Sequence, residues 1–290
     1  MEIRLAANAG FCYGVERAVS SVCREIEQAS GRVYTYGQIV HNEIVTDELG
    51  RKGVRVISDF DELKALAESG ELNGASVVIR AHGVGLEVYE LLSTVKDVRL
   101  VDATCPFVRK IHDIVKEKHG QGCRIIICGN PGHPEVKGIL GQIGGDAIVL
   151  ENTADAAGLA ADSTHHFCVV AQTTFQVEKF KDIVDILKKT LYYVTIVNTI
   201  CNATQLRQSE ALELSRECDC MIVIGSTHSS NTAKLFEICN RECRLSYCIQ
   251  SLDDLKGIPV YPVRCVGITA GASTPKSIIE EVVKYVRDEF

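Results

Sequence analysis

Three cysteines at nearly even spacing are the residues of this chain best suited to metal chemistry. Cys12, Cys105 and Cys201 each follow a strand-like run and precede a helix-like run, and they lie 93 and 96 residues apart in a chain of 290. Thiolates are soft ligands that suit zinc, copper and iron–sulfur clusters. The spacing predicts one thiol in each third of the chain, and a shared metal centre if the thirds converge.

Further polar residues keep the same period. A second strand-like run in each third ends at a glycine, and the fourth residue after that glycine is His41, His133 or Ser229. Each third of the chain also has a third apolar run, which leads to His82, Thr173 and Ser273, respectively. Glycine and polar residues follow strands in any α/β protein. Here three separate features recur at the same spacing in all three repeats, and this favours a common site. The residues proposed to bind an anion there are His41, His82, His133, Ser229, Asn231 and Ser273, aided by helix N-termini.

Glu135 lies two residues after His133 and is the natural proton donor of such a site. The alternative is a glutamate favoured at a helix start by the helix dipole. Thr173 is expected to relay protons through its hydroxyl group, or else to cap the next helix.

Apolar strands that alternate with amphipathic helices must position these residues. This alternation predicts an α/β fold with mostly parallel sheets. We expect three units related by a pseudo-threefold axis, over residues 1–96, 97–193 and 194–290, the last with a C-terminal helix. Ligands of open α/β sheets bind beyond the carboxyl ends of the strands, where every residue named above falls.

Three thiolates do not complete a closed tetrahedral zinc site, and the chain has no C-x2-C pair. An iron–sulfur cube on three cysteines would leave one iron open as a Lewis acid. A three-iron cluster and a single catalytic metal with an open position are the alternatives. For the other ten cysteines core packing is expected, as for Cys23, Cys123, Cys128, Cys168 and Cys265, although the spacing of Cys239 and Cys243 leaves a second metal site conceivable.

Composition limits the partners and the compartment. The net charge of −7 argues against nucleic acid or an anionic membrane surface as the main partner. No apolar run approaches the ~18 residues of a membrane span. The N-terminal residues do not resemble a secretory signal, so we expect a cytoplasmic protein with reduced cysteines.

Nine short motifs, spread in order over nearly the whole chain, resemble the LytB/IspH family of 4-hydroxy-3-methylbut-2-enyl diphosphate reductases. Each motif is weak by itself, and their order and spacing make the resemblance specific. The motifs cover residues 10–15, 40–42, 80–84, 102–106, 132–136, 171–174, 200–204, 229–232 and 270–273.

The resemblance implies three α/β units around one [4Fe–4S] cluster per chain, bound by Cys12, Cys105 and Cys201. It implies a diphosphate site made by His41, His82, His133, Thr173, Ser229, Ser230, Asn231 and Ser273. Glu135 would deliver protons, and Thr173 and His133 would assist it.

The implied reaction is the last step of the non-mevalonate isoprenoid pathway. It adds two electrons and two protons to the allylic diphosphate, releases water and yields isopentenyl and dimethylallyl diphosphate, with ferredoxin or flavodoxin as electron donor. The alternatives are a cluster-dependent dehydratase without net redox change, a non-catalytic iron–sulfur sensor or carrier, and an α/β scaffold without a cluster.

Overall fold

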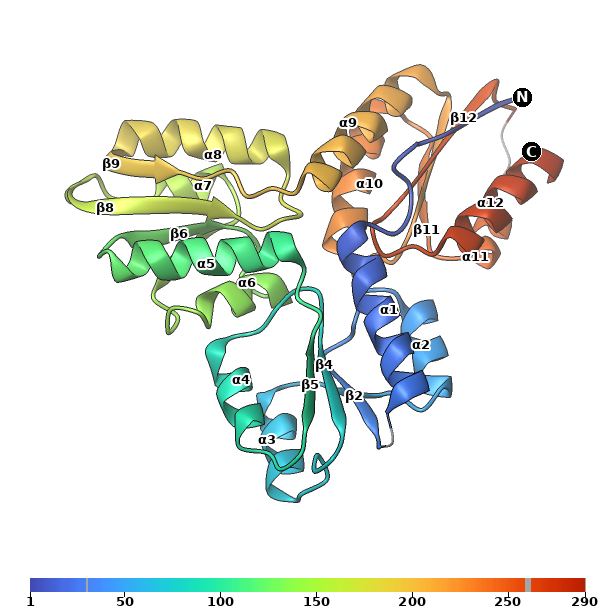
Figure 1. Cartoon of the computed structure of the whole chain (residues 1–290). Helices are drawn as coiled ribbons and strands as arrows, with labels where there is room; N and C mark the ends of the chain where they lie inside the picture. Colours follow the sequence, from blue (N-terminus) through green and yellow to red (C-terminus); the bar gives the residue numbers. More distant parts are fainter. Residues whose placement is uncertain (30, 259–261, 290) are drawn as a thin grey trace. The chain divides into compact units, whose positions relative to one another are not determined.

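Three four-stranded parallel sheets form the framework of the protein. The computed structural model describes residues 1–29, 31–258 and 262–289. Over these residues twelve strands alternate strictly with twelve helices, and every strand pairing is parallel (Figure 1). The α/β class with three parallel-sheet units is therefore confirmed.

The first sheet has the strand order β3-β2-β4-β5. Its strands are β2 (Val33–Tyr36), β3 (Arg55–Ile57), β4 (Ser76–Ile79) and β5 (Arg99–Asp102). The helices of this part of the chain are α1 (Tyr13–Gln28), α2 (Glu43–Arg51), α3 (Phe60–Glu68) and α4 (Leu86–Ser93). All four residues of β2 and of β4 are buried, which is typical of central strands covered on both faces.

The second sheet has the order β7-β6-β8-β9. Its strands are β6 (Arg124–Cys128), β7 (Ala147–Leu150), β8 (Asp162–Ala171) and β9 (Leu191–Ile196). The accompanying helices are α5 (Pro106–Gly120), α6 (Pro134–Leu140), α7 (Thr153–Ala157) and α8 (Val177–Thr190). Alternate residues of β6 belong to different cores: Ile126 packs with the apolar side of α8, and Ile127 with α5 and α6.

The third sheet has the order β1-β12-β10-β11. Its strands are β1 (Glu2–Leu5), β10 (Cys220–Ile224), β11 (Ser246–Ile249) and β12 (Cys265–Ala270). The helices are α9 (Asn202–Glu217), α10 (Ser230–Glu242), α11 (Leu252–Lys256) and α12 (Lys276–Glu289). Ile222 shares a core with α12, whereas Val223 faces α9 and α10.

The strand before each of the three spaced cysteines is an edge strand of a sheet whose other strands come from a different repeat. Thus β5 pairs with β4, β9 with β8, and β1 with β12. The division of the chain into residues 1–96, 97–193 and 194–290 stays a prediction. A sequence period gives the length of a repeat, but it does not say where the repeat begins.

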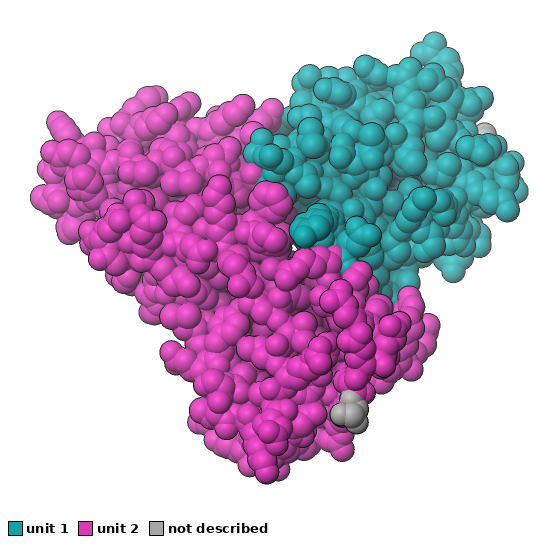
Figure 2. All heavy atoms as spheres, in the orientation of Figure 1, with its two compact units in different colours: residues 1–16, 40–47, 201–290 teal, residues 17–39, 48–200 magenta. Residues whose placement is uncertain are grey.

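The described part of the chain folds into two compact units (Figure 2). Unit 1 comprises residues 1–16, 40–47 and 201–290, and unit 2 comprises residues 17–39 and 48–200. The third sheet lies in unit 1, and the first and second sheets lie in unit 2. The longest described helices, α1 and α9, have 16 residues, and no helix of the described residues has the length and apolar character to span a bilayer.

Candidate functional site

Unit 1 carries two of the three spaced cysteines, and both stand at the start of a helix. Cys201 is the N-cap of α9. Cys12 immediately precedes α1, and its carbonyl oxygen accepts the N–H of Glu16 at 2.9 Å. Both residues are half-buried free thiols. The partial positive charge at a helix N-terminus stabilises a thiolate, which is the form that binds metal.

The two thiols interact electrostatically with each other. Burial raises the pKa of the Cys201 thiol above its ordinary value, and the charge of Cys12 raises it further. The N–H groups of Ala203 and Thr204 hydrogen-bond the Cys201 sulfur and oppose this rise. A metal centre would convert such thiols to thiolates, because binding releases the protons.

Unit 2 carries the third spaced cysteine, Cys105, as the N-cap of α5 with Pro106 after it. Its N–H donates to the carbonyl oxygen of Ala81 at 2.9 Å, next to His82. Strands β4 and β5 are neighbours, with Ile79 opposite Asp102, so the loops that follow both strands start at the same sheet edge. Cys105 and the loop that carries His82 therefore lie next to each other.

Arg17 and Asp102 hold the Cys105 loop, and neither residue was predicted to have a role in the site. The guanidinium of Arg17 donates to the carbonyl oxygens of Thr104 at 2.9 Å and of Asp102 at 3.2 Å. The Asp102 carboxylate accepts the N–H of Thr104 at 2.9 Å and a guanidinium N–H of Arg109 at 2.7 Å. The sequence signal was Asp102 itself, a carboxylate that ends an apolar strand three residues before a cysteine.

Glu135 and Thr173 form a buried acid–hydroxyl pair in unit 2. The hydroxyl group of Thr173 donates to Oε2 of Glu135 at 2.7 Å, and the Thr173 N–H donates to Oε1 at 2.6 Å. Glu135 is only 1% exposed. Burial raises the pKa of its carboxyl group to about 7, although both hydrogen bonds from Thr173 act against the rise. A carboxyl group with this pKa can hold and release a proton near neutral pH.

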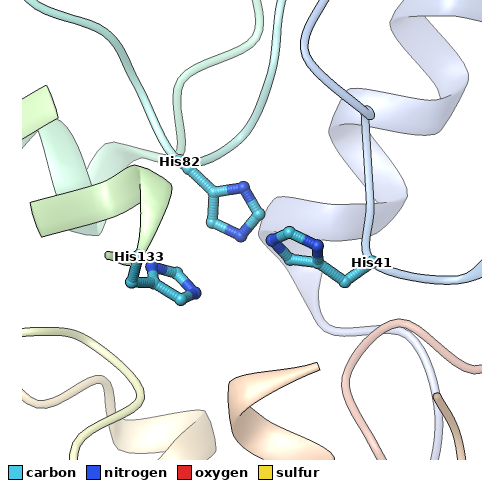
Figure 3. Close-up of side chains that lie close together, drawn as sticks. All are labelled: His41, His82 and His133. Carbon is cyan, nitrogen blue, oxygen red and sulfur yellow. The ribbon is translucent and has the colours of Figure 1, made fainter. Parts of the chain in front are cut away.

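His133 and His82 lie beside one another in unit 2 (Figure 3). Their rings are edge-to-face, with centroids 5.2 Å apart. His133 is the N-cap of α6, and its Nδ1 accepts the N–H of Glu135 at 3.1 Å. His133 thus contacts both His82, a predicted anion-binding residue, and the backbone of the buried Glu135.

Helix α6 holds the two histidines together because it packs closely on the loop after His82. Gln142 donates to the carbonyl oxygen of Val84 at 2.6 Å, and the N–H of Leu86 donates to Gly141 at 3.2 Å. A Cβ atom added at Gly138 would lie only 3.2 Å from the backbone of Gly83. The glycine therefore permits this approach.

The predicted phosphate-binding residues of unit 1 lie at the carboxyl ends of β10 and β12. These ends are adjacent, with Ile224 opposite Ala270. Ser229 is the N-cap of α10, and Ser230 and Asn231 form its first turn. The amide nitrogen of Asn231 is buried and has no hydrogen-bond partner among the described residues.

Ser273, in the loop after β12, links this group to His41 and Cys12. Its hydroxyl group donates to the carbonyl oxygen of His41 at 3.1 Å. The N–H of Cys12 donates to Ala272 at 3.2 Å. Unit 1 therefore gathers seven of the predicted residues, namely Cys12, His41, Cys201, Ser229, Ser230, Asn231 and Ser273. The other five, His82, Cys105, His133, Glu135 and Thr173, lie in unit 2, and convergence of all three thiols stays a prediction.

Most of the remaining cysteines are core residues. Cys128, Cys168 and Cys265 are buried as predicted, whereas Cys23 and Cys123 are half-buried. Cys239 and Cys243 are buried in a cluster with Ala211, Val223 and Leu235. This apolar surrounding supports the packing role over a second metal site.

Comparison with known proteins gives one consistent result. The family model described as LytB protein matches residues 3–287. The 4-hydroxy-3-methylbut-2-enyl diphosphate reductase of Thermoanaerobacter sp. (strain X514) is 42% identical over 99% of this chain and 97% of its own length. The reductase of the same name from Clostridioides difficile (strain 630) is 38% identical over 99% of this chain and all of its own.

Two solved structures share the fold over 99% of this chain. The E-1-hydroxy-2-methyl-but-2-enyl-4-diphosphate reductase from Plasmodium falciparum superposes with a TM-score of 0.87 at 28% identity, over 88% of that chain. An (E)-4-hydroxy-3-methyl-but-2-enyl diphosphate reductase, the terminal enzyme of the non-mevalonate pathway, gives 0.68 at 36% identity over its full length. With a matching family model over nearly every residue and relatives this similar, the chain belongs to the LytB protein family.

Proposed function

We propose that this protein reduces (E)-4-hydroxy-3-methylbut-2-enyl diphosphate, removing its hydroxyl group as water to give isopentenyl and dimethylallyl diphosphate. The reaction consumes two electrons and two protons. Full-length similarity to reductases of this name supports the proposal. The single structural observation that carries it is the buried Glu135–Thr173 pair, because this reaction needs a proton source shielded from water.

We propose one [4Fe–4S] cluster per chain, held by Cys12, Cys105 and Cys201. The donor set fits, because each cysteine is a half-buried residue at the start of a helix. When bound, the cluster would supply electrons and an open iron that acts as a Lewis acid.

The diphosphate group is the part of the substrate that these residues are proposed to bind. Ser229 and Ser230 offer hydroxyl groups at the start of α10, and Asn231 offers an unused amide donor. Ser273, Thr173 and the three histidines His41, His82 and His133 complete the proposed set. Binding energy from the diphosphate would fix the reacting end of the substrate without changing the groups that react.

Glu135 is proposed as the proton donor, with Thr173 and His133 as assisting residues. With a pKa of about 7, the carboxyl group is substantially protonated at neutral pH, where an ordinary glutamate is not. Thr173 fixes the orientation of the carboxyl group through two hydrogen bonds. His133 fixes the first turn of α6, on which Glu135 stands.

We further propose ferredoxin or flavodoxin as the electron donor, and the cytoplasm as the compartment. A reducing compartment keeps the thirteen cysteines reduced, and the structure shows no disulfide among them.

An anaerobic assay with a defined reductant tests the proposal. The reconstituted protein should consume two reducing equivalents for each diphosphate product formed, and its absorption spectrum should change when substrate binds. Turnover without reductant would instead identify a dehydratase. Cluster binding without diphosphate affinity would identify a sensor or carrier, and protein that takes up no iron would be a scaffold.

A further inference from the structure

Arg207 is a buried arginine on α9 whose guanidinium joins the backbone segments next to two of the spaced cysteines. It is 4% exposed and lies in unit 1 with Cys12 and Cys201. Its Nη2 donates to the carbonyl oxygen of Gly10 at 2.8 Å, and its Nη1 donates to Ala203 at 3.1 Å. Gly10 precedes Cys12 by two residues and Ala203 follows Cys201 by two, so one side chain connects both cysteine segments.

A second contact from the same helix strengthens this connection. Both carboxylate oxygens of Glu210, one turn after Arg207, accept hydrogen bonds from Asn8 at 3.0 and 2.9 Å. Thus α9 holds the segment before Cys12 at two points. The Glu210 carboxylate is used by Asn8, although its charge also acts on Arg207.

The buried guanidinium of Arg207 keeps one N–H group for a further hydrogen-bond acceptor. Burial lowers the pKa of the guanidinium, while the charges of Cys12 and Cys201 act on it in the opposite direction. Its Nε is buried and has no hydrogen-bond partner among the described residues. An unpaired donor on a buried cation is costly unless an anion or acceptor completes its bonding.

We propose that Arg207 is a positioning residue for the cluster: it tethers the Cys12 segment to the first turn of α9, and its positive charge favours the reduced state. This inference rests on the proposed function, because it assumes that Cys12 and Cys201 bind the cluster. Reduction adds negative charge, which a nearby fixed cation would stabilise, and the Nε–H group, which has no partner among the described residues, would be the donor for a cluster sulfur.

Arginine suits this role better than lysine. The planar guanidinium presents several N–H groups in a fixed fork, so it can serve two carbonyl oxygens and still keep a donor. Lysine would keep the charge but lose that geometry. Arg207→Lys therefore separates the electrostatic contribution from the tether, whereas Arg207→Met removes both.

The test compares these two variants with the wild type and with Arg216→Met. Arg216 lies on the same helix but is exposed and pairs with Glu242 at 3.1 Å, so it is a matched control. Each protein is reconstituted anaerobically, and three quantities are measured: iron per chain, the rate of iron loss to a chelator, and the midpoint potential from an EPR-monitored titration. Circular dichroism of each apoprotein reports whether it is folded.

We expect the Arg207→Met variant to lose iron faster and to be harder to reduce. Its equilibrium constant for one-electron reduction should fall about tenfold, which corresponds to a potential about 59 mV more negative. Arg207→Lys should nearly retain the potential but still lose iron faster. Arg216→Met should match the wild type in all three measurements.

The outcomes separate this inference from the proposed function. A wild type that takes up no cluster would overturn the proposed function and this inference with it. A wild type with a normal cluster, and an Arg207→Met variant that matches Arg216→Met, would overturn the role of Arg207 alone. If Arg207→Met fails to fold, Arg207→Lys decides, because wild-type iron retention in that variant would refute the tether.

Discussion

The proposed proton transfer depends on the buried carboxyl group of Glu135. Glu135→Gln should lower kcat at least about 100-fold, because an amide cannot supply the proton. Cluster absorption and substrate affinity should stay within a few-fold of wild type, as the amide preserves shape. Single-turnover kinetics measure the rate, and substrate titration measures the affinity. Glu151→Gln is the control, because Glu151 is exposed. A Glu135→Gln variant with normal turnover would remove Glu135 from the proton path.

The raised pKa of Glu135 also predicts a dependence of stability on pH. Its pKa is higher in the folded protein than in the unfolded chain, so the folded state binds the extra proton. The resulting contribution is fully present below about pH 4.5 and is lost as the pH rises through about 7. In urea unfolding of the apoprotein, the contribution of Glu135 to the free energy of unfolding should be roughly 3 kcal/mol smaller at pH 8 than at pH 4. The Glu135→Gln variant should lack this pH-dependent contribution. If the variant kept the pH dependence of the wild type, the prediction would be wrong.

Thr173 allows a finer test of the same pair. Thr173→Val removes the hydroxyl donor to Glu135, so the pKa of the carboxyl group should rise further and the alkaline limb of the kcat profile should move to higher pH. Thr173→Ser keeps a hydroxyl group and should retain the wild-type profile. Identical profiles for the two variants would argue against this hydrogen bond as a determinant of the pKa.

Residue types and spacing are sufficient to predict that Glu135 and Thr173 belong to one site. The protonation of Glu135 could not be predicted, because it depends on burial by packed neighbours. Arg207 was missed for a related reason. Its partners are backbone carbonyl oxygens, one of them nearly two hundred residues away in the chain, and these leave no side-chain pattern in the sequence.

At the scale of elements, the contact between α6 and the loop after His82 is the feature most open to test. Gly138→Ala would place a methyl group about 3.2 Å from the Gly83 backbone, so the Gly83 segment or α6 has to move by a few tenths of an ångström. We expect a loss of about 1–3 kcal/mol in unfolding free energy and weaker diphosphate binding, because His82 and His133 would separate. Gly120→Ala is the control, since an added Cβ there meets nothing within 4 Å. Equal stability of the two variants would show that the approach is not tight.

The alternation of strands and helices was predictable from apolar periodicity, but sheet membership was not. Strands β1, β5 and β9 read as the openings of their repeats, yet each pairs at the edge of another repeat's sheet. Parallel strands are joined through a crossover helix, so adjacency in the sheet need not follow the apparent repeat boundary. Which strands pair depends on which sheet edge is open when the strand docks. Apolar periodicity along one sequence does not reveal this.

For the whole molecule, the proposed cluster predicts that cysteines differ sharply in function. Cys105→Ser should lose or degrade the cluster, whereas Cys239→Ser should keep iron close to the wild-type level, because Cys239 lies in an apolar core. Iron analysis and absorption of anaerobically reconstituted protein distinguish the two. Strong iron loss in the Cys239→Ser variant would show that the C-terminal cysteines have a metal-binding role.

The pairing of β1 with β12 has a consequence for how the molecule is made. Glu2 lies opposite Cys265, so a ribosome produces one strand long before its neighbour exists. Until synthesis reaches β12, the amide groups on that side of β1 have only solvent or a chaperone to bond with, and contacts so distant in sequence form slowly. Nascent chains halted before β12 should therefore expose the segment that leads to Cys12 to proteases, and the proposed cluster should form only at a late step of biogenesis.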